Sequence, residues 1–217
     1  MNHDHTDAAR TVIHTALAMN AQGLNRGSAG NVSLRLGDGF LVTPSGMAYP
    51  DLLPEDVVWV GLDGRWDRHG RKPSSEWQFH QAIYAARPEI NAVVHTHSSF
   101  ASTLAVLERD IPPFHYMVAA AGGRDIRCAP YATTGSPELA ETTVTALAGR
   151  RACLLAHHGL IACGPDAERA LDLAAEVEDL AKIYVQALAI AEPPRLEDAE
   201  MTRMQEIFKA YGANAQD

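Results

Sequence analysis

The 217 residues are enough for one domain with a well-buried core, and their composition indicates neither disorder nor a fibrous repeat. The 18 basic and 27 acidic residues give a net charge of −9 without a lysine or arginine cluster, which argues against nucleic acid or an anionic membrane as a partner. No apolar stretch is long enough to cross a membrane, and three dispersed cysteines indicate a reducing compartment. We therefore expect a single cytoplasmic domain over residues 1–217.

The first third of the chain predicts a helix followed by a hairpin and a second helix. Residues 1–6 have the composition of a disordered tail, and apolar residues then repeat at helical spacing over 7–20. Asp38-Gly39 between two alternating segments is a hairpin signal. Ser75, with Gln78 three residues later, fits a capping box, so another helix is expected to begin there.

Helices and apolar strands continue to alternate in the rest of the chain. Ser136-Pro137 is a typical helix start, and a long helical pattern begins at Asp166 and stops before Pro193. Residues 197–217 are expected to form a C-terminal helix and tail. Strands that alternate with helices, some joined by hairpins, predict an α/β domain with a mixed sheet covered on both faces.

A buried strand that begins near Ile90 carries two histidines at its end. His95 and His97 lie two residues apart, so their side chains point to the same side of the strand. Two imidazoles at a strand end are half of a tetrahedral zinc site, which needs at least one more protein ligand. His157 and His158, where another apolar strand breaks, are both candidates, and spacing alone does not separate them.

Glu76 lies in the first turn of the helix predicted after Ser75. A carboxylate is favoured at that position by the helix dipole alone. If the helix start faces the strand ends, Glu76 is either a fourth metal ligand or a carboxylate base beside the metal. The residue pattern leaves both roles open.

Three short segments rich in hydroxyls, glycine or amide lie at strand or helix ends: Ser28–Asn31, Thr43–Gly46 and Ser74–Ser75. Backbone nests and helix N-termini bind phosphate without basic side chains. Each segment alone is an ordinary turn, but beside a metal site they favour a small phosphorylated substrate. Tyr116 and Tyr211 are candidates only because a phenol can donate a proton or a hydrogen bond.

Several sequence blocks, in the same order, resemble the class II aldolase/adducin family over nearly the whole chain. The blocks are residues 30–33 (GNVS), 43–46 (TPSG), 73–77 (PSSEW), 92–97 (AVVHTH), 111–123, 128–132 (CAPYA) and 157–163 (HHGLIAC). So many matched blocks are far more specific than any single motif. The resemblance implies a three-layer α/β/α fold with a central mixed, mainly antiparallel sheet.

The resemblance also implies one zinc ion (Zn²⁺) per subunit beside a carboxylate acid/base. The implied metal ligands are His95, His97 and His158, and the implied acid/base is Glu76. The implied phosphate-binding residues are Ser28, Asn31, Ser45, Gly46, Ser74 and Ser75. Tyr116 and Tyr211 match groups that a neighbouring subunit contributes, which implies a homotetramer with its sites between subunits.

The reaction that the resemblance implies is retro-aldol cleavage of a 1-phosphorylated ketose to dihydroxyacetone phosphate and a small aldehyde. L-fuculose 1-phosphate is the expected substrate and would give L-lactaldehyde, with Tyr116 handling the proton on the aldehyde oxygen. The departures bear on the aldehyde end: Thr134 replaces a bulky aromatic, and the tail after Gly212 lacks a basic residue. Ser45 replaces a threonine in the phosphate turn.

Three other functions occur with this fold. A resemblance to the L-ribulose-5-phosphate 4-epimerase predicts an aspartate at the position of Glu76. The glutamate of this chain therefore favours the aldolase. An aldolase or dehydratase acting on 5-deoxyribulose or methylthioribulose 1-phosphate shares the same motifs and stays open. The adducin head is an interaction module without the metal ligands, and the retained histidines argue against it.

Overall fold

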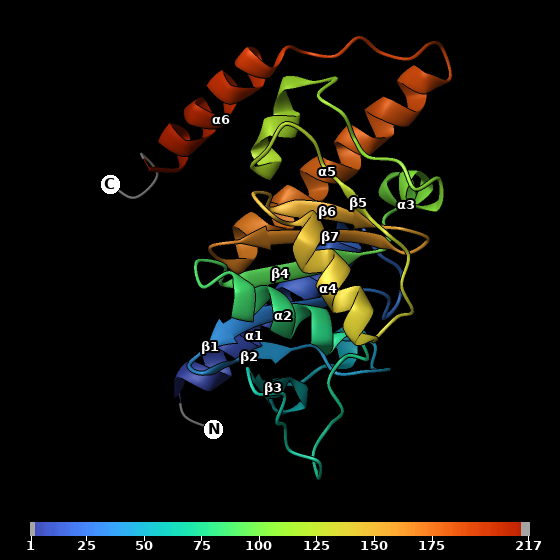
Figure 1. Ribbon diagram of the computed structural model, residues 1–217. Coiled ribbons are helices and arrows are strands. Elements are labelled where there is room, and N and C mark those ends of the chain that lie inside the picture. The colour runs from blue at the N-terminus through green and yellow to red at the C-terminus, as the bar shows by residue number, and fades with distance from the viewer. Residues whose placement is uncertain (1–2, 214–217) are drawn as a thin grey trace.

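The computed structural model describes the backbone of residues 3–213 and the side chains of residues 3–210. A seven-stranded sheet crosses the molecule in the order β3-β2-β1-β4-β7-β6-β5 (Figure 1). The strands are β1 (Asn31–Leu36), β2 (Gly39–Val42), β3 (Val58–Gly61), β4 (Ala92–Thr96), β5 (Cys128–Ala129), β6 (Ala152–Leu155) and β7 (Gly159–Gly164). Neighbouring strands are antiparallel except β5 and β6, which are parallel.

Helices cover both faces of this sheet. They are α1 (His3–Ala21), α2 (Trp77–Ala86), α3 (Ser99–Val106), α4 (Pro137–Ala146), α5 (Ala167–Leu188) and α6 (Asp198–Ala213), with short 3₁₀ helices η1 (Tyr49–Asp51), η2 (Pro54–Asp56) and η3 (Tyr116–Ala121). One apolar cluster lies between the sheet and α1, α3 and α5, and a second lies under α2 and α4. The predicted single α/β domain, with three layers and a mainly antiparallel sheet, is confirmed.

The central strand β4 is buried on both faces, which explains its continuous apolar sequence. Ala92 and Val94 belong to the cluster under α1, α3 and α5, whereas Val93 belongs to the cluster under α2 and α4. In the register of the sheet, His95 of β4 lies opposite Asn31 of β1 on one side and Ile161 of β7 on the other. The polar end of β4 is therefore enclosed by its two neighbours.

Two expected helix starts differ from the structure. α1 begins at His3, so residues 3–6, which we expected in a disordered tail, are helical, and the His3 imidazole lies 2.8 Å from the Asp7 carboxylate one turn later. Residues 1–2 lie outside the described part. The capping box at Ser75 is wrong: α2 starts at Trp77 after Glu76, because the backbone N–H of Glu76 bonds to the Ser74 hydroxyl (3.3 Å).

Two other helix starts match their sequence signals. The Ser136 hydroxyl accepts the N–H of Leu139 (3.1 Å) at the start of α4, and the Asp166 carboxylate accepts that of Arg169 (2.8 Å) at the start of α5. α6 covers most of the predicted C-terminal helix, and the tail after residue 213 lies outside the described part.

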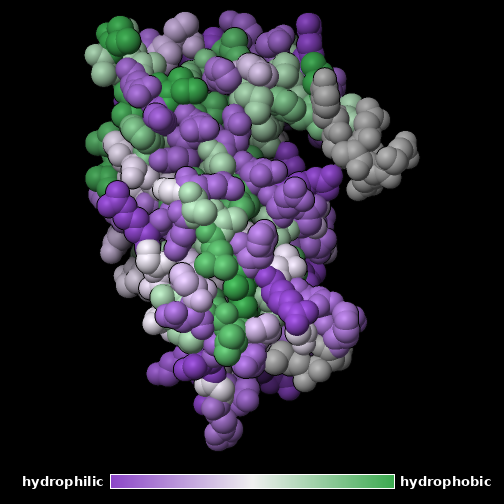
Figure 2. Space-filling model, turned by 180° about the vertical axis from the view of Figure 1, so that it is seen from behind, coloured by the Kyte–Doolittle hydropathy of each residue, from purple (hydrophilic) through white to green (hydrophobic). Residues whose placement is uncertain are grey.

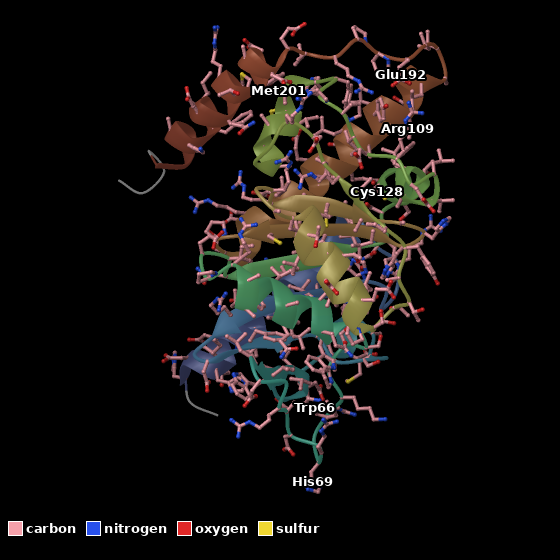
Figure 3. All side chains as sticks on the ribbon, in the orientation of Figure 1. Trp66, His69, Arg109, Cys128, Glu192 and Met201 are labelled. Atoms are coloured by element: carbon pink, nitrogen blue, oxygen red, sulfur yellow. The ribbon has the colours of Figure 1, made fainter. Side chains whose placement is uncertain are left out.

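The two ends of the molecule are built differently. Trp66 and His69 mark the loop after β3 at one end, and Met201 of α6 marks the other (Figure 3). α6 packs mainly against η3 and extends beyond the layers that cover the sheet (Figure 1). Among the helices described, none combines the length and apolar character that crossing a membrane requires.

Candidate metal centre and active site

Two segments bring three histidines together at one end of the central strands of the sheet. His95 and His97 come from the end of β4, and His158 comes from the turn between β6 and β7. The Nε2 atom of His95 lies 2.9 Å from Nε2 of His97 and 3.2 Å from Nε2 of His158. The three rings meet edge to face, with centroids 4.7 to 4.9 Å apart.

The turn that carries His158 lies against the end of β4. A Cβ atom at Gly159 would lie 2.2 Å from the carbonyl oxygen of Thr96, so only glycine permits this approach. The same pairing brings the Leu160 carbonyl within 2.9 Å of Nδ1 of His95. Because that carbonyl can only accept, Nδ1 of His95 donates to it, which leaves Nε2 as the ring nitrogen that faces the other two histidines.

The opposite side of the histidine pair is fixed by the loop before β1. The Asn25 side-chain oxygen accepts the backbone N–H of His97 (2.6 Å), and Asn25 is buried. Gly30 has a φ of +70°, and a Cβ atom there would lie 2.1 Å from Nδ2 of Asn25 and 2.4 Å from the carbonyl oxygen of His95. The ends of β1 and β4 therefore pack without space for a side chain between them.

Glu76 completes the cluster from the start of α2. Its Oε1 lies 3.0 Å from Nε2 of His158, and its Oε2 lies 3.3 Å from Nε2 of His95. The residue is only 7% exposed. Burial alone would raise the pKa of this carboxyl, but the imidazoles of His95 and His158 lower it well below its usual range, so Glu76 is a carboxylate.

These four side chains fit a tetrahedral divalent metal. One ligand atom from each lies within 4.8 Å of the other three. Metal–nitrogen bonds of about 2.0–2.1 Å place two tetrahedral ligands roughly 3.3 Å apart, which is close to the two Nε2 separations from His95. Burial, followed by the neighbouring imidazoles, lowers the pKa of His97 to about 4, so this ring is in the neutral form that binds metal.

The structure separates His158 from its neighbour. His157 takes a left-handed backbone conformation (φ 56°), and its Nε2 lies 3.1 Å from the Glu108 carboxylate on the surface. His158 turns inward to the cluster. Tyr131 packs edge-on against the His157 ring at a centroid distance of 5.8 Å, so His157 forms part of the rim of the site.

A cavity of about 480 Å³ opens beside the cluster, and the three small-residue turns line it. Its walls include all six residues expected to bind phosphate, namely Ser28, Asn31, Ser45, Gly46, Ser74 and Ser75. Two of the turns are held together by backbone bonds from Ser45 N–H to Lys72 (3.0 Å) and from Ser74 N–H to Thr43 (3.0 Å). Segments about 30 residues apart in the chain therefore form one wall.

The two tyrosines lie elsewhere. Tyr116 is on η3, is 47% exposed, and packs against Phe208 of α6 at a centroid distance of 6.4 Å. It is not among the described residues that line the cavity of its own chain. The side chain of Tyr211 lies outside the described part.

Comparison with known proteins assigns this site to a family. The class II aldolase and adducin N-terminal domain matches residues 10–185. The chain belongs to this family. An L-fuculose 1-phosphate aldolase of known structure superimposes on this class II aldolase with a TM-score of 0.90 at 38% identity, covering 94% of this chain and 96% of the other.

Curated relatives of this class II aldolase are named as aldolases. It is 54% identical to the 5-methylthioribulose-1-phosphate/5-deoxyribulose-1-phosphate aldolase of Rhodospirillum rubrum, over 100% of this chain and 94% of the relative. It is 51% identical to the L-fuculose phosphate aldolase of Escherichia coli, over 94% of this chain and 95% of the relative. The chain is therefore a class II, metal-dependent aldehyde-lyase.

Sequence reasoning missed two contacts of Glu76 in this aldolase. Oε1 accepts the hydroxyl of Thr134 (2.7 Å), and Oε2 accepts the side-chain amide of Asn31 (2.9 Å). The family resemblance assigns Asn31 to phosphate binding, and Thr134 stands out in the sequence only as a departure from the family pattern. No local signal reveals either bond, because each joins segments at least 45 residues apart.

Replacing His97 tests the metal centre. We expect His97→Ala to lose most of its bound Zn²⁺, because it removes one of three converging imidazoles, whereas His157→Ala, one residue from a ligand, keeps it. Equilibrium dialysis with Zn²⁺ followed by metal analysis measures both. Equal zinc content in His97→Ala and the unaltered protein would place the metal elsewhere.

Proposed function

We propose that this class II aldolase cleaves a 1-phosphorylated ketose to dihydroxyacetone phosphate and a small aldehyde. The proposal is carried by one observation: three imidazole Nε2 atoms and a buried carboxylate converge at the inner end of a cavity walled by hydroxyl- and glycine-rich turns. Imidazoles and a carboxylate suit a divalent cation, and the turns suit a phosphate group.

His95, His97 and His158 would hold the metal, one ion per subunit, and their all-nitrogen set favours Zn²⁺. A bound divalent cation supplies a Lewis acid for the negative charge that collects on the substrate oxygens during cleavage. The backbone carbonyl of Leu160 and the amide of Asn25 keep His95 and His97 in position for it.

Cleavage breaks the bond between C3 and C4 of the ketose. The hydroxyl on C4 loses its proton and becomes the aldehyde, while C3 gains a proton and becomes part of dihydroxyacetone phosphate. Glu76 lines the cavity and transfers the proton at C3: its carboxylate takes up a proton from solvent and donates it to C3. Tyr116 of the partner subunit relays the proton of the C4 hydroxyl to solvent, its phenol releasing one proton as it accepts the other.

The phosphate of the substrate binds among the small-residue turns, with Ser28, Ser45 and Gly46 on one side and Ser74 and Ser75 on the other. Among the described residues, no lysine or arginine lines this cavity. Backbone N–H groups and hydroxyls therefore bind the anion. Asn31 lies between this wall and Glu76, and we extend its role below.

We further propose a homotetramer with its sites between subunits. Tyr116 is exposed on η3 away from its own cavity, which suits a residue that serves a neighbour, and we give Tyr211 of α6 the same role. Hydrophobic side chains form a strip across the face seen from behind (Figure 2), as expected of a surface that another subunit covers. A sedimentation mass equal to the 23.4 kDa of one chain would contradict this assembly.

A cytoplasmic location is proposed on separate grounds. Cys128, Cys153 and Cys163 are all free thiols, and two of them are buried. Such cysteines suit a reducing compartment. Recovery of the protein outside the cytoplasmic fraction of its cells would contradict this location.

Three substrates fit the proposed reaction. L-fuculose 1-phosphate gives L-lactaldehyde, and 5-deoxyribulose 1-phosphate gives acetaldehyde, while its methylthio analogue gives a methylthio-substituted acetaldehyde. The Thr134 hydroxyl donates its proton to Glu76 (2.7 Å), so it can only accept a hydrogen bond from the hydroxyl of lactaldehyde. The name of the relative that aligns over the whole chain favours the deoxypentulose substrates over L-fuculose 1-phosphate.

A product assay over a substrate panel tests the reaction. The zinc-loaded protein should release dihydroxyacetone phosphate from 5-deoxyribulose and 5-methylthioribulose 1-phosphates at a higher kcat/KM than from L-fuculose or L-rhamnulose 1-phosphate. A coupled assay for dihydroxyacetone phosphate measures each rate. Release from none of them, with epimerisation of L-ribulose 5-phosphate, would instead identify an epimerase.

Removing the charge of Glu76 tests its role. Glu76→Gln should lower kcat by about 10²- to 10⁴-fold, because loss of a general acid/base costs that much, while bound metal changes little. Glu108→Gln is the matched control, since the Glu108 carboxylate lies 3.1 Å from Nε2 of His157 and Glu108 is not among the described residues that line the cavity. Normal turnover in Glu76→Gln would remove this residue from proton transfer.

A further inference from the structure

A chain of hydrogen-bonded side chains leads from Glu76 into the core between β1 and α2. Oε2 of Glu76 lies 2.9 Å from Nδ2 of Asn31, and Oδ1 of Asn31 lies 2.5 Å from Nε2 of His80. Nδ1 of His80 lies 2.6 Å from the hydroxyl of Ser33, which lies 2.8 Å from the hydroxyl of Tyr84. Neither the metal centre nor the phosphate site uses the last three residues.

The chemistry of its two ends gives this chain a single direction. The amide nitrogen of Asn31 faces Oε2 of Glu76 and donates to it, so Asn31 presents its oxygen to His80. His80 must therefore carry its proton on Nε2. Burial, followed by the proximity of His95, lowers the pKa of His80 to about 3, so the ring is neutral and Nδ1 accepts from Ser33. Ser33 in turn accepts from Tyr84.

The four side chains that continue this series of hydrogen bonds beyond Glu76 are all buried. Ser33 and His80 are 0% exposed, Tyr84 is 1% exposed and Asn31 is 2% exposed. His80 packs against Phe79 and Phe40, within the apolar cluster under α2. Buried polar groups cost free energy unless they are hydrogen-bonded, so an apolar side chain would serve the core better at this position. The polar residues lead instead to an active-site carboxylate.

We propose that His80 is a positioning residue that holds Asn31 in one amide orientation and so fixes the carboxylate of Glu76. The Nε2–H of His80 requires an oxygen opposite it, which leaves the amide nitrogen of Asn31 for Oε2 of Glu76. The other oxygen, Oε1, then faces Thr134 and the cavity. Without His80, the Asn31 amide can rotate by half a turn and present its oxygen to the carboxylate, which repels it.

This inference rests on the proposed function, because it assigns Glu76 a reaction to serve. It differs from a purely structural role in one respect. A positioning residue affects the chemical step, whereas a residue needed only for folding affects stability, metal content and substrate binding together.

Variants of His80 separate these roles. His80→Phe keeps a ring of similar shape without nitrogens, and it should lower kcat about 10- to 100-fold, the order expected of a displaced catalytic group, with KM and zinc content within twofold of the unaltered protein. His80→Gln, whose amide can again donate to Asn31, should recover most of the loss. Thr143→Val, which removes an equally buried hydroxyl of α4, is the matched control and should leave kcat unchanged.

A second variant keeps the inference testable if His80→Phe does not fold. Ser33→Ala removes only the hydroxyl that donates to Nδ1 of His80. In the unaltered protein, the ¹⁵N chemical shifts of the His80 ring should show protonated Nε2 and bare Nδ1 without any substrate. Ser33→Ala should lose this single tautomer and lower kcat by a smaller factor than His80→Phe.

Each result has a distinct meaning. Failure of the unaltered protein on every ketose phosphate would overturn the proposed reaction, whereas the tautomer would still report on the chain of hydrogen bonds. An active protein whose His80→Phe variant keeps its kcat, or loses zinc in proportion to kcat, would overturn the positioning role. A protonated Nδ1 in His80 would overturn the proposed direction of the hydrogen bonds between Tyr84 and Glu76.

Discussion

The antiparallel pairing of β4 with β7 is the contact on which the rest of the site depends. It places His95 opposite Ile161 and brings the turn before Gly159 against the end of β4, close enough to exclude any Cβ atom. The same pairing orients His95 through the carbonyl of Leu160. A candidate metal ligand on one strand is thus oriented by the backbone of the other, so the pair of strands is also the scaffold of the candidate metal centre.

The buried charge of Glu76 requires hydrogen-bonding partners around its carboxylate. Glu76 is a carboxylate at 7% exposure, and its surroundings consist of two imidazoles, the Thr134 hydroxyl and the Asn31 amide. A buried charge is stable only when such partners are in place. The metal centre and the hydrogen bonds around Glu76 therefore belong to one electrostatic unit, in which each group lowers the cost of burying the others.

The parts of the site that could be predicted are those whose geometry depends only on residues close together in the sequence. Alternation along a strand puts His95 and His97 on one side, whatever the rest of the chain does. His157 and His158 could not be separated in this way, because the left-handed turn at His157 decides which of them points inward. The helix cap was predicted one residue too early, at Ser75, since the Ser74 hydroxyl bonds the backbone of Glu76 and α2 starts after Glu76. The contact between Asn31 and His80 depends on how α2 lies over β1, which no sequence spacing reveals.

The placement of the ligands on the central strand has a thermodynamic consequence. β4 is paired on both sides and buried on both faces, so its end cannot come free without opening the sheet. A cation that binds only the folded chain shifts the folding equilibrium by mass action, by an amount that grows with the logarithm of its free concentration. Because the candidate ligands and the core share one strand, removal of a bound cation by chelation would lower the temperature at which the whole sheet unfolds.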